Sequence, residues 1–152
     1  MRMRISHALV AAAFAGSLFT ATAYAQQMKP EELLKARQGL MEAVRLQLGP
    51  IFGAAKGGGS LADAAQAADN LVGLANTLKT AYAKGTEDLP GSNAKPEAFS
   101  DPKFIGGYDK LAEAAAKVAA DAKANNADAL KADVGAIGEA CKGCHDNFRK
   151  KS

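Results

Sequence analysis

Apolar residues recur every three or four positions along most of the chain, with polar residues between them. This spacing places the apolar side chains on one face of an α-helix. Four segments carry the pattern: about Pro30 to Ala55, Ser60 to about Lys84, Asp101 to Asn125–Asn126, and about Ala127 to the basic C-terminal end. No segment shows the alternation of a β-strand. The pattern therefore predicts an all-α chain.

Signals at the ends of these segments agree with four helices. Pro30 suits a first helical turn, and the glycine run 57–59 ends the first helix. Ser60 and Asp101 are expected to cap the second and third helices. A polar stretch from Gly85 to Ser100 is the one long connection. Two short links and one longer loop predict an antiparallel up-down-up-down four-helix bundle. An irregular helical domain is the alternative.

The N-terminal segment has the composition of an export signal. Two early arginines precede a mostly apolar run, Ile5 to Thr20, and Ala23-Tyr24-Ala25 is a small-x-small cleavage site. A membrane anchor or a first core helix is the alternative, but the run is short for a membrane span. We expect residues 1–25 to be a cleaved signal peptide and residues 26–152 to form one periplasmic domain without a membrane span.

Cleavage would change the inventory of charged and ligand-forming residues. Two of the 19 basic residues would leave and none of the 16 acidic ones, so the net charge would fall from +3 to +1. A near-neutral chain argues against nucleic acid as a partner. His145 would be the one remaining histidine, with Met28 and Met41 the remaining methionines. One histidine leaves no nucleophile–base pair, so we do not expect an enzyme.

The strongest chemical signal is the run Cys141-Lys142-Gly143-Cys144-His145. Cys141 and Cys144 lie three residues apart on the predicted last helix, and His145 follows Cys141 by four, so all three are expected to face the bundle interior. Two thiols at this spacing add across the two vinyl groups of one haem while the imidazole reaches the iron. The run predicts one covalent haem c, with thioethers at Cys141 and Cys144 and His145 as axial ligand.

Other interpretations of the cysteine pair are less consistent with the sequence. A disulfide is permitted in an exported protein, but a bridge within one helical turn is strained and leaves His145 without a role. A thioredoxin-like pair belongs to an α/β fold. A zinc site needs a fourth ligand, which only a carboxylate would supply here. A haem-free helical binding module with a cysteine pair is the alternative from a different functional class.

Residues on the first helix and at the C-terminus are candidates for the surroundings of the haem. Met41 lies on the apolar face of the first helix, and either binds the iron or only walls off a vacant sixth site. Arg37, one turn earlier, is either a snorkelling arginine or a cation paired with a haem propionate. Arg149, one turn after His145, either covers the proximal side of the imidazole or belongs to a solvated tail.

Several short segments along residues 26–152 carry a family resemblance. They are Lys29-Pro30-Glu31, Arg37-Gln38 with Met41, Lys56-Gly57, Gly85-Thr86-Glu87, Ala94-Lys95-Pro96-Glu97, Phe99-Ser100-Asp101 and Gly138 to Lys151. With them the chain resembles the class II cytochromes c, the cytochrome c' family. The C-terminal CxxCH is itself discriminating, because class I cytochromes c carry theirs near the N-terminus. The chain departs from the pattern at Phe99, where tryptophan is common at or next to this place.

The resemblance implies a left-handed four-helix bundle, often a homodimer through the first helix pair. It also implies His145 as proximal ligand, Met41 at the distal position, and Arg37 with Gln38 near the propionates. Most cytochromes c' leave the sixth site empty and bind nitric oxide or carbon monoxide, whereas a sister group uses a methionine aligned with Met41 as sixth ligand.

We therefore expect a five-coordinate, high-spin haem protein that binds these diatomic gases, transfers single electrons, or does both. The alternative with the same fold is a low-spin Met41/His145 electron carrier. The basic residues Lys142, Arg149, Lys150 and Lys151 are expected to frame the exposed haem edge and to dock an acidic redox partner, or else only to solvate the tail.

Overall fold

The computed structural model describes residues 28–151. Its helices are α2 (Pro30–Ala55), α3 (Leu61–Leu78), the short 3₁₀ helix η1 (Pro96–Phe99), α4 (Pro102–Lys123), α5 (Ala127–Asp133) and α6 (Gly135–Phe148). The predicted signal peptide, residues 1–25, lies outside the described part. Within residues 28–151 no helix is long and apolar enough to cross a membrane.

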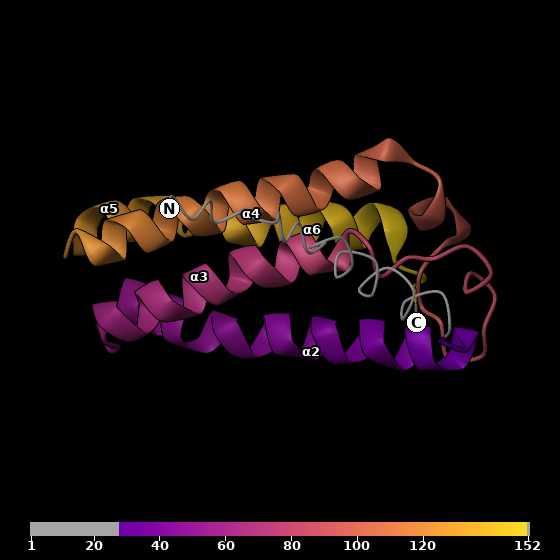
Figure 1. Ribbon diagram of the computed structural model, residues 1–152. Helices are drawn as coiled ribbons and strands as arrows, with labels where there is room; N and C mark the ends of the chain where they lie inside the picture. Colours follow the sequence, from indigo (N-terminus) through magenta and orange to yellow (C-terminus); the bar gives the residue numbers. More distant parts are fainter. Residues whose placement is uncertain (1–27, 152) are drawn as a thin grey trace, which may run out of the picture.

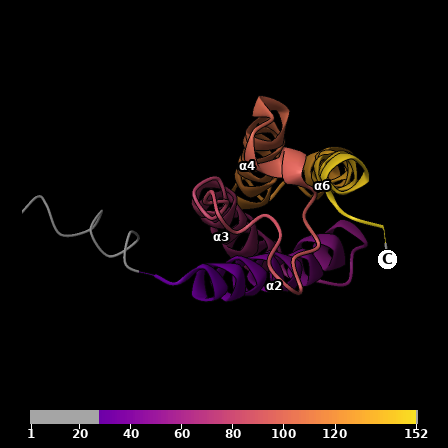
Figure 2. The same cartoon turned by 90° about the vertical axis from the view of Figure 1, so that its right-hand side faces the viewer.

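The long helices run up and down beside one another in chain order. Helix α3 returns along α2, α4 returns along α3, and α5 with α6 returns along α4 (Figure 1). Viewed end on, α2, α3, α4 and α6 stand at the four corners of a bundle (Figure 2). The predicted all-α, antiparallel four-helix bundle is confirmed.

The predicted helix starts have the expected caps. The side chain of Ser60 accepts a hydrogen bond from the backbone N–H of Asp63 at 3.3 Å, and that of Asp101 accepts one from Lys103 at 2.8 Å. These bonds satisfy backbone donors that the first helical turn leaves free. At the end of α2, Gly57 has φ +78°, a left-handed conformation that a glycine adopts without strain.

The second helix is shorter than predicted, ending at Leu78 and not near Lys84. The backbone tightens here, because the N–H groups of Thr80 and Ala81 donate to the carbonyls of Thr77 and Leu78, three residues back. The Thr80 hydroxyl also donates to the Thr77 carbonyl at 2.8 Å. A hydroxyl that binds a nearby backbone group competes with the helical bonding pattern.

The fourth predicted helix is divided in two at Val134. There the N–H of Ile137 donates to the carbonyl of Val134, a three-residue bond in place of the four-residue helical one. The helix also stops before the basic tail. Arg149 is extended, with φ −100° and ψ 134°, and forms an isolated antiparallel bridge with Ala94. The helix thus ends at Phe148, directly before the basic end, as predicted, and the segment beyond it bonds to the long loop.

The core is densest along α3 and α4, whose buried faces are rich in alanine. Small side chains allow these helix backbones to approach closely, and larger apolar residues fill the remaining space. The fully buried large side chains include Ile51, Leu71, Leu78, Val118, Leu130 and Ile137. Helix α2 packs against α5 at one end of the bundle, whereas towards the other end a cavity lies between α2 and α6.

Candidate functional site

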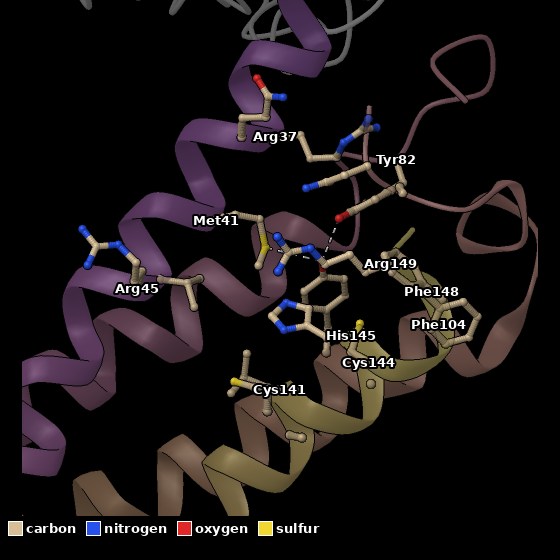
Figure 3. A pocket seen from close by; sticks show the side chains of 18 of the residues that line it. Arg37, Met41, Arg45, Tyr82, Phe104, Cys141, Cys144, His145, Phe148 and Arg149 are labelled. Atoms are coloured by element: carbon tan, nitrogen blue, oxygen red, sulfur yellow. Dashed lines mark hydrogen bonds between the residues drawn. The ribbon is translucent and has the colours of Figure 1, made fainter. Parts of the chain in front are cut away.

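A cavity of about 420 Å³ opens between the first and last helices of the bundle. Its walls come from α2, α4, α6 and the loop that joins α3 to α4 (Figure 3). The volume is in the usual range for a bound small molecule or cofactor. The apolar part of the wall includes Leu34, Val44, Leu48, Phe104, Leu111, Ala140 and Phe148.

The three motif side chains border this one cavity. Cys141 and Cys144 are half-buried on α6, and neither forms a disulfide. His145 also lines the cavity, although its side chain is exposed, so it stands at the rim and not in a closed core. Figure 3 shows the three side chains projecting from α6 on the side of the cavity opposite Met41.

The environment of the thiols argues against a redox pair or a zinc site. Burial raises the pKa of Cys141, and it raises the pKa of Cys144 to about 11 with a smaller contribution from neighbouring Cys141. Such raised pKa values keep the thiols protonated, whereas a redox-active cysteine pair works through a thiolate with a lowered pKa. Among residues 28–151 no group of three or more His, Cys, Asp or Glu side chains is placed to hold a metal ion.

Met41 and Gly107 shape the middle of the cavity. Met41 projects into it from α2 and accepts a hydrogen bond from the Tyr108 hydroxyl, with 3.9 Å between oxygen and sulfur. Gly107, in α4, has no side chain at a place where a Cβ atom would lie 3.8 Å from the Cβ of Cys144. Because Gly107 has no side chain, nothing projects from this part of the cavity wall beside Cys144.

Arg37 is a buried cation at the edge of the cavity. Its side chain is 4% exposed, so it does not reach solvent as a snorkelling arginine would. Nη1 donates to the Thr86 hydroxyl at 3.1 Å and Nη2 to the Ser92 hydroxyl at 3.3 Å. The guanidinium also lies 4.7 Å from the ring centre of Tyr82 and 5.2 Å from that of Phe99.

Arg37 forms no ion pair with a carboxylate among residues 28–151, although the charge of Glu87 acts to raise its pKa. Within residues 28–151 the ion pairs involve other side chains, and the two hydrogen-bond partners of Arg37 are neutral hydroxyls. Burial lowers the pKa of Arg37, which measures the cost of removing the cation from water. A buried cation beside a cavity is complemented by an anionic group on the molecule that fills the cavity.

The other two predicted site residues lie at the mouth of the cavity. Gln38 Nε2 donates to the Gly91 carbonyl at 3.2 Å. The Arg149 N–H donates to the His145 carbonyl at 3.2 Å, and its backbone pairs with Ala94. Both side chains line the cavity. The long loop between α3 and α4 is thus bonded to α2 through Gln38 and to the residue after α6 through Arg149.

Sequence reasoning missed several residues that line the cavity or support it. Tyr82 and Tyr108 were not expected at the site, yet a buried tyrosine hydroxyl requires a partner, which is a signal in the sequence. Gly107, in the middle of a helical pattern, was another. Ser92 gave no signal, and Thr86 entered only as part of a segment of the family resemblance, because both stand in a polar loop whose packing depends on contacts distant in sequence.

The residues present fit a haem group. Two thiols and an imidazole border an apolar cavity, with a thioether opposite. The buried Arg37, which has no ion-pair partner among the described residues, suits a propionate, and Gly107 gives a planar group room beside Cys144. The donor set therefore agrees with covalent attachment to a macrocycle that carries vinyl and carboxylate groups.

Comparison with known proteins decides the family. The sequence profile described as Cytochrome C' matches residues 32–149. The chain belongs to the cytochrome c' family. Over 131 residues it is 37% identical to the cytochrome c' of Rubrivivax gelatinosus, an alignment that covers 83% of this chain and 100% of the relative. The family binds haem c, so the predicted haem binding is confirmed at the level of the family.

Solved cytochrome c' structures have the same fold. That of Thermochromatium tepidum superposes with a TM-score of 0.73 at 29% identity, covering 82% of this chain and 100% of its own. The nitric oxide complex of a cytochrome c prime mutant from Alcaligenes xylosoxidans gives 0.71 at 31% identity, covering 81% and 98%. The family resemblance drawn from the sequence is therefore confirmed.

Proposed function

We propose that this chain is an exported cytochrome that carries one haem c through thioethers at Cys141 and Cys144. His145 is the axial iron ligand, and the sixth coordination site, facing Met41, is open. The protein binds nitric oxide or carbon monoxide there and also carries single electrons. Bound haem supplies an iron that takes a diatomic ligand and changes its charge by one electron.

The observation that carries this proposal is the placement of all three motif side chains on one cavity with an apolar wall. The buried Arg37 supports it, because its two hydroxyl partners leave its charge free to attract a propionate. The nitric oxide complex of the Alcaligenes relative supports gas binding. The proposed role is binding and electron transfer, not enzymatic catalysis, since the sole histidine of residues 26–152 is used as a ligand.

Absorption spectra of the purified, haem-loaded protein test the open sixth site. We expect a high-spin ferric spectrum and ready binding of carbon monoxide to the ferrous form. A low-spin ferric spectrum, combined with no carbon monoxide binding, would contradict an open site while leaving haem attachment intact.

A six-coordinate Met41/His145 electron carrier is the second candidate, because the Met41 thioether borders the same cavity. The variant Met41→Ala separates the two candidates. If Met41 binds the iron, high-spin character and carbon monoxide binding appear only in the variant. If the site is open, the wild type already has both. Met28→Ala is the matched control, since Met28 is exposed at the N-terminal end and does not line the cavity.

The cellular location and assembly are further parts of the proposal. Export to the periplasm depends on residues 1–25, and N-terminal sequencing of the purified protein tests it, with Gln26 as the expected first residue. A homodimer through α2 and α3 is expected for the family. The α2 residue Leu46 is 59% exposed and offers an apolar contact for it. Sedimentation of wild type and Leu46→Lys tests the dimer.

A further inference from the structure

Two tyrosines and Met41 form a chain of hydrogen bonds beside the cavity. The Tyr108 hydroxyl donates to the Met41 sulfur, with 3.9 Å between the atoms, and lies 3.2 Å from the Tyr82 hydroxyl. The three residues come from α2, α4 and the segment after α3, so the chain joins three walls of the cavity.

Tyr108 is the donor in both hydrogen bonds. A thioether sulfur only accepts, whereas each phenol oxygen both donates and accepts. The single Tyr108 proton therefore has two acceptors within reach, the Tyr82 oxygen and the Met41 sulfur. Tyr108 is 5% exposed, so water does not replace a lost acceptor easily. If the sulfur turned away, the buried hydroxyl would lose one of its two acceptors, at an energetic cost.

The packing holds the hydroxyl more firmly than the methionine. The ring of Tyr108 packs edge-on against Phe104 at 5.3 Å between centres. Tyr82 packs against Phe104 at 4.4 Å and against Phe99 at 5.5 Å, with the Arg37 guanidinium over its face. Met41 has an unbranched side chain with three rotatable bonds. Of the two partners, the methionine is therefore the one that moves.

We propose that Tyr108 is a positioning residue that holds the Met41 sulfur back from the iron and so keeps the sixth site open to a diatomic ligand. This rests on the proposed function, in which His145 binds the iron from the other side. Tyr82 competes with Met41 as an acceptor of the Tyr108 proton. The Tyr108–Met41 bond thus favours gas binding over closure of the site by methionine.

The variant Tyr108→Phe tests this, because it keeps the ring and removes only the hydroxyl. In the haem-loaded protein we expect the ratio of low-spin to high-spin ferric species, measured by electron paramagnetic resonance, to rise about twofold, because a thioether is a weak acceptor and such a bond has the strength of the weakest hydrogen bonds. Tyr82→Phe should not raise the ratio, because it leaves Met41 as the remaining acceptor of the Tyr108 proton. The double variant Tyr108→Phe/Met41→Leu should return to high spin, because leucine offers no ligand.

Three results of these experiments would overturn the proposal. An unchanged spin ratio in Tyr108→Phe means that the hydroxyl does not hold the sulfur. A low-spin species that persists in the double variant has a ligand other than Met41. A wild type that is already low-spin shows that Tyr108 does not keep the site open. Haem content separates these failures from that of the proposed function, since a chain purified without haem overturns both, whereas a haem-loaded Tyr108→Phe protein with an unchanged spectrum overturns only this inference.

Discussion

Arg37 and Thr86 are joined by a 3.1 Å hydrogen bond between Nη1 and Oγ1. The same guanidinium holds Ser92, so α2 fixes two points of the loop that closes one side of the cavity. Thr86 is 1% exposed and its hydroxyl also donates to the Ala83 carbonyl at 2.8 Å. The buried cation is therefore one anchor of the loop, beside the Gln38–Gly91 bond and the Ala94–Arg149 bridge.

Thr86→Val should lower the free energy of unfolding by about 1–3 kcal/mol, because it leaves a buried charged donor without its acceptor while the side-chain volume stays similar. Urea denaturation of the haem-loaded protein measures this. Thr80→Val is the control, since its hydroxyl is exposed and bonds only to its own turn; it should cost less than about 0.5 kcal/mol. Equal losses in the two variants would contradict the anchoring role of Arg37.

Gly106 and Gly107 give a matched test of the cavity wall. Both lie inside α4, so replacing either by leucine raises helix propensity equally. Gly107→Leu also places a side chain beside Cys144, where overpacking costs about 1–3 kcal/mol. Intact-mass measurement should find the haem-loaded fraction at least about fivefold lower in Gly107→Leu and unchanged in Gly106→Leu. Equal loading of the two would show that the haem does not lie against Gly107.

Asp121 and Asp133 should affect the pH dependence of stability with opposite signs. Burial, followed by the bond to Asp133, raises the pKa of Asp121, whose Oδ2 has no hydrogen-bond partner among the described residues. The hydrogen bond from Lys117, 2.9 Å from Asp133, lowers the pKa of Asp133.

A raised pKa in the folded state means that Asp121 destabilises the protein as the pH rises past its unfolded value of about 3.9. Asp121→Asn should therefore raise the urea midpoint at pH 7, with the gain fading below pH 4. A lowered pKa means that Asp133 stabilises above that value, so Asp133→Asn should lower the midpoint at pH 7, and this loss should vanish in stronger acid. Midpoints that move the same way at pH 7 would contradict these assignments.

Electron exchange with an acidic redox partner should slow as ionic strength rises. The reason is that salt screens the attraction between the partner and the basic rim, which consists of Lys142, Arg149, Lys150 and Lys151. Lys142, between the two cysteines, is exposed although it pairs with Asp146. Lys142→Gln should reduce both the rate and its salt dependence in stopped-flow measurements. Lys131→Gln is the control, since it removes the same charge from α5, at the opposite end of the bundle from the C-terminal end of α6 (Figure 1). Rates independent of salt would contradict docking at this rim.

The sequence was a good guide wherever the structure depends on neighbours along the chain. The bounds of α2 and the caps at Ser60 and Asp101 followed from periodicity and local hydrogen-bonding chemistry. The same locality made the CxxCH run interpretable, because its three side chains are spaced along a single helix. Their shared cavity is consistent with the predicted haem site, although their bonds to haem stay a prediction.

The parts not predicted depend on residues far apart in sequence. The Arg37–Thr86 bond and the Ala94–Arg149 bridge each join the long loop to a helix, and no periodicity signals such a contact. The Tyr108–Met41 bond joins two helices whose relative rotation the apolar pattern fixes only coarsely. These contacts form only when folding brings the loop and the helices together, so local sequence patterns do not determine them.

The central claim is that one haem is bonded to both Cys141 and Cys144, and a tryptic digest tests it directly. Cleavage after Lys131, Lys142 and Arg149 places the two cysteines on separate peptides, residues 132–142 and 143–149. After reduction, mass spectrometry should find the two peptides still joined, with the mass of both plus one haem, because a reductant opens disulfides but not thioethers. Two separate, unmodified peptides would contradict the claim.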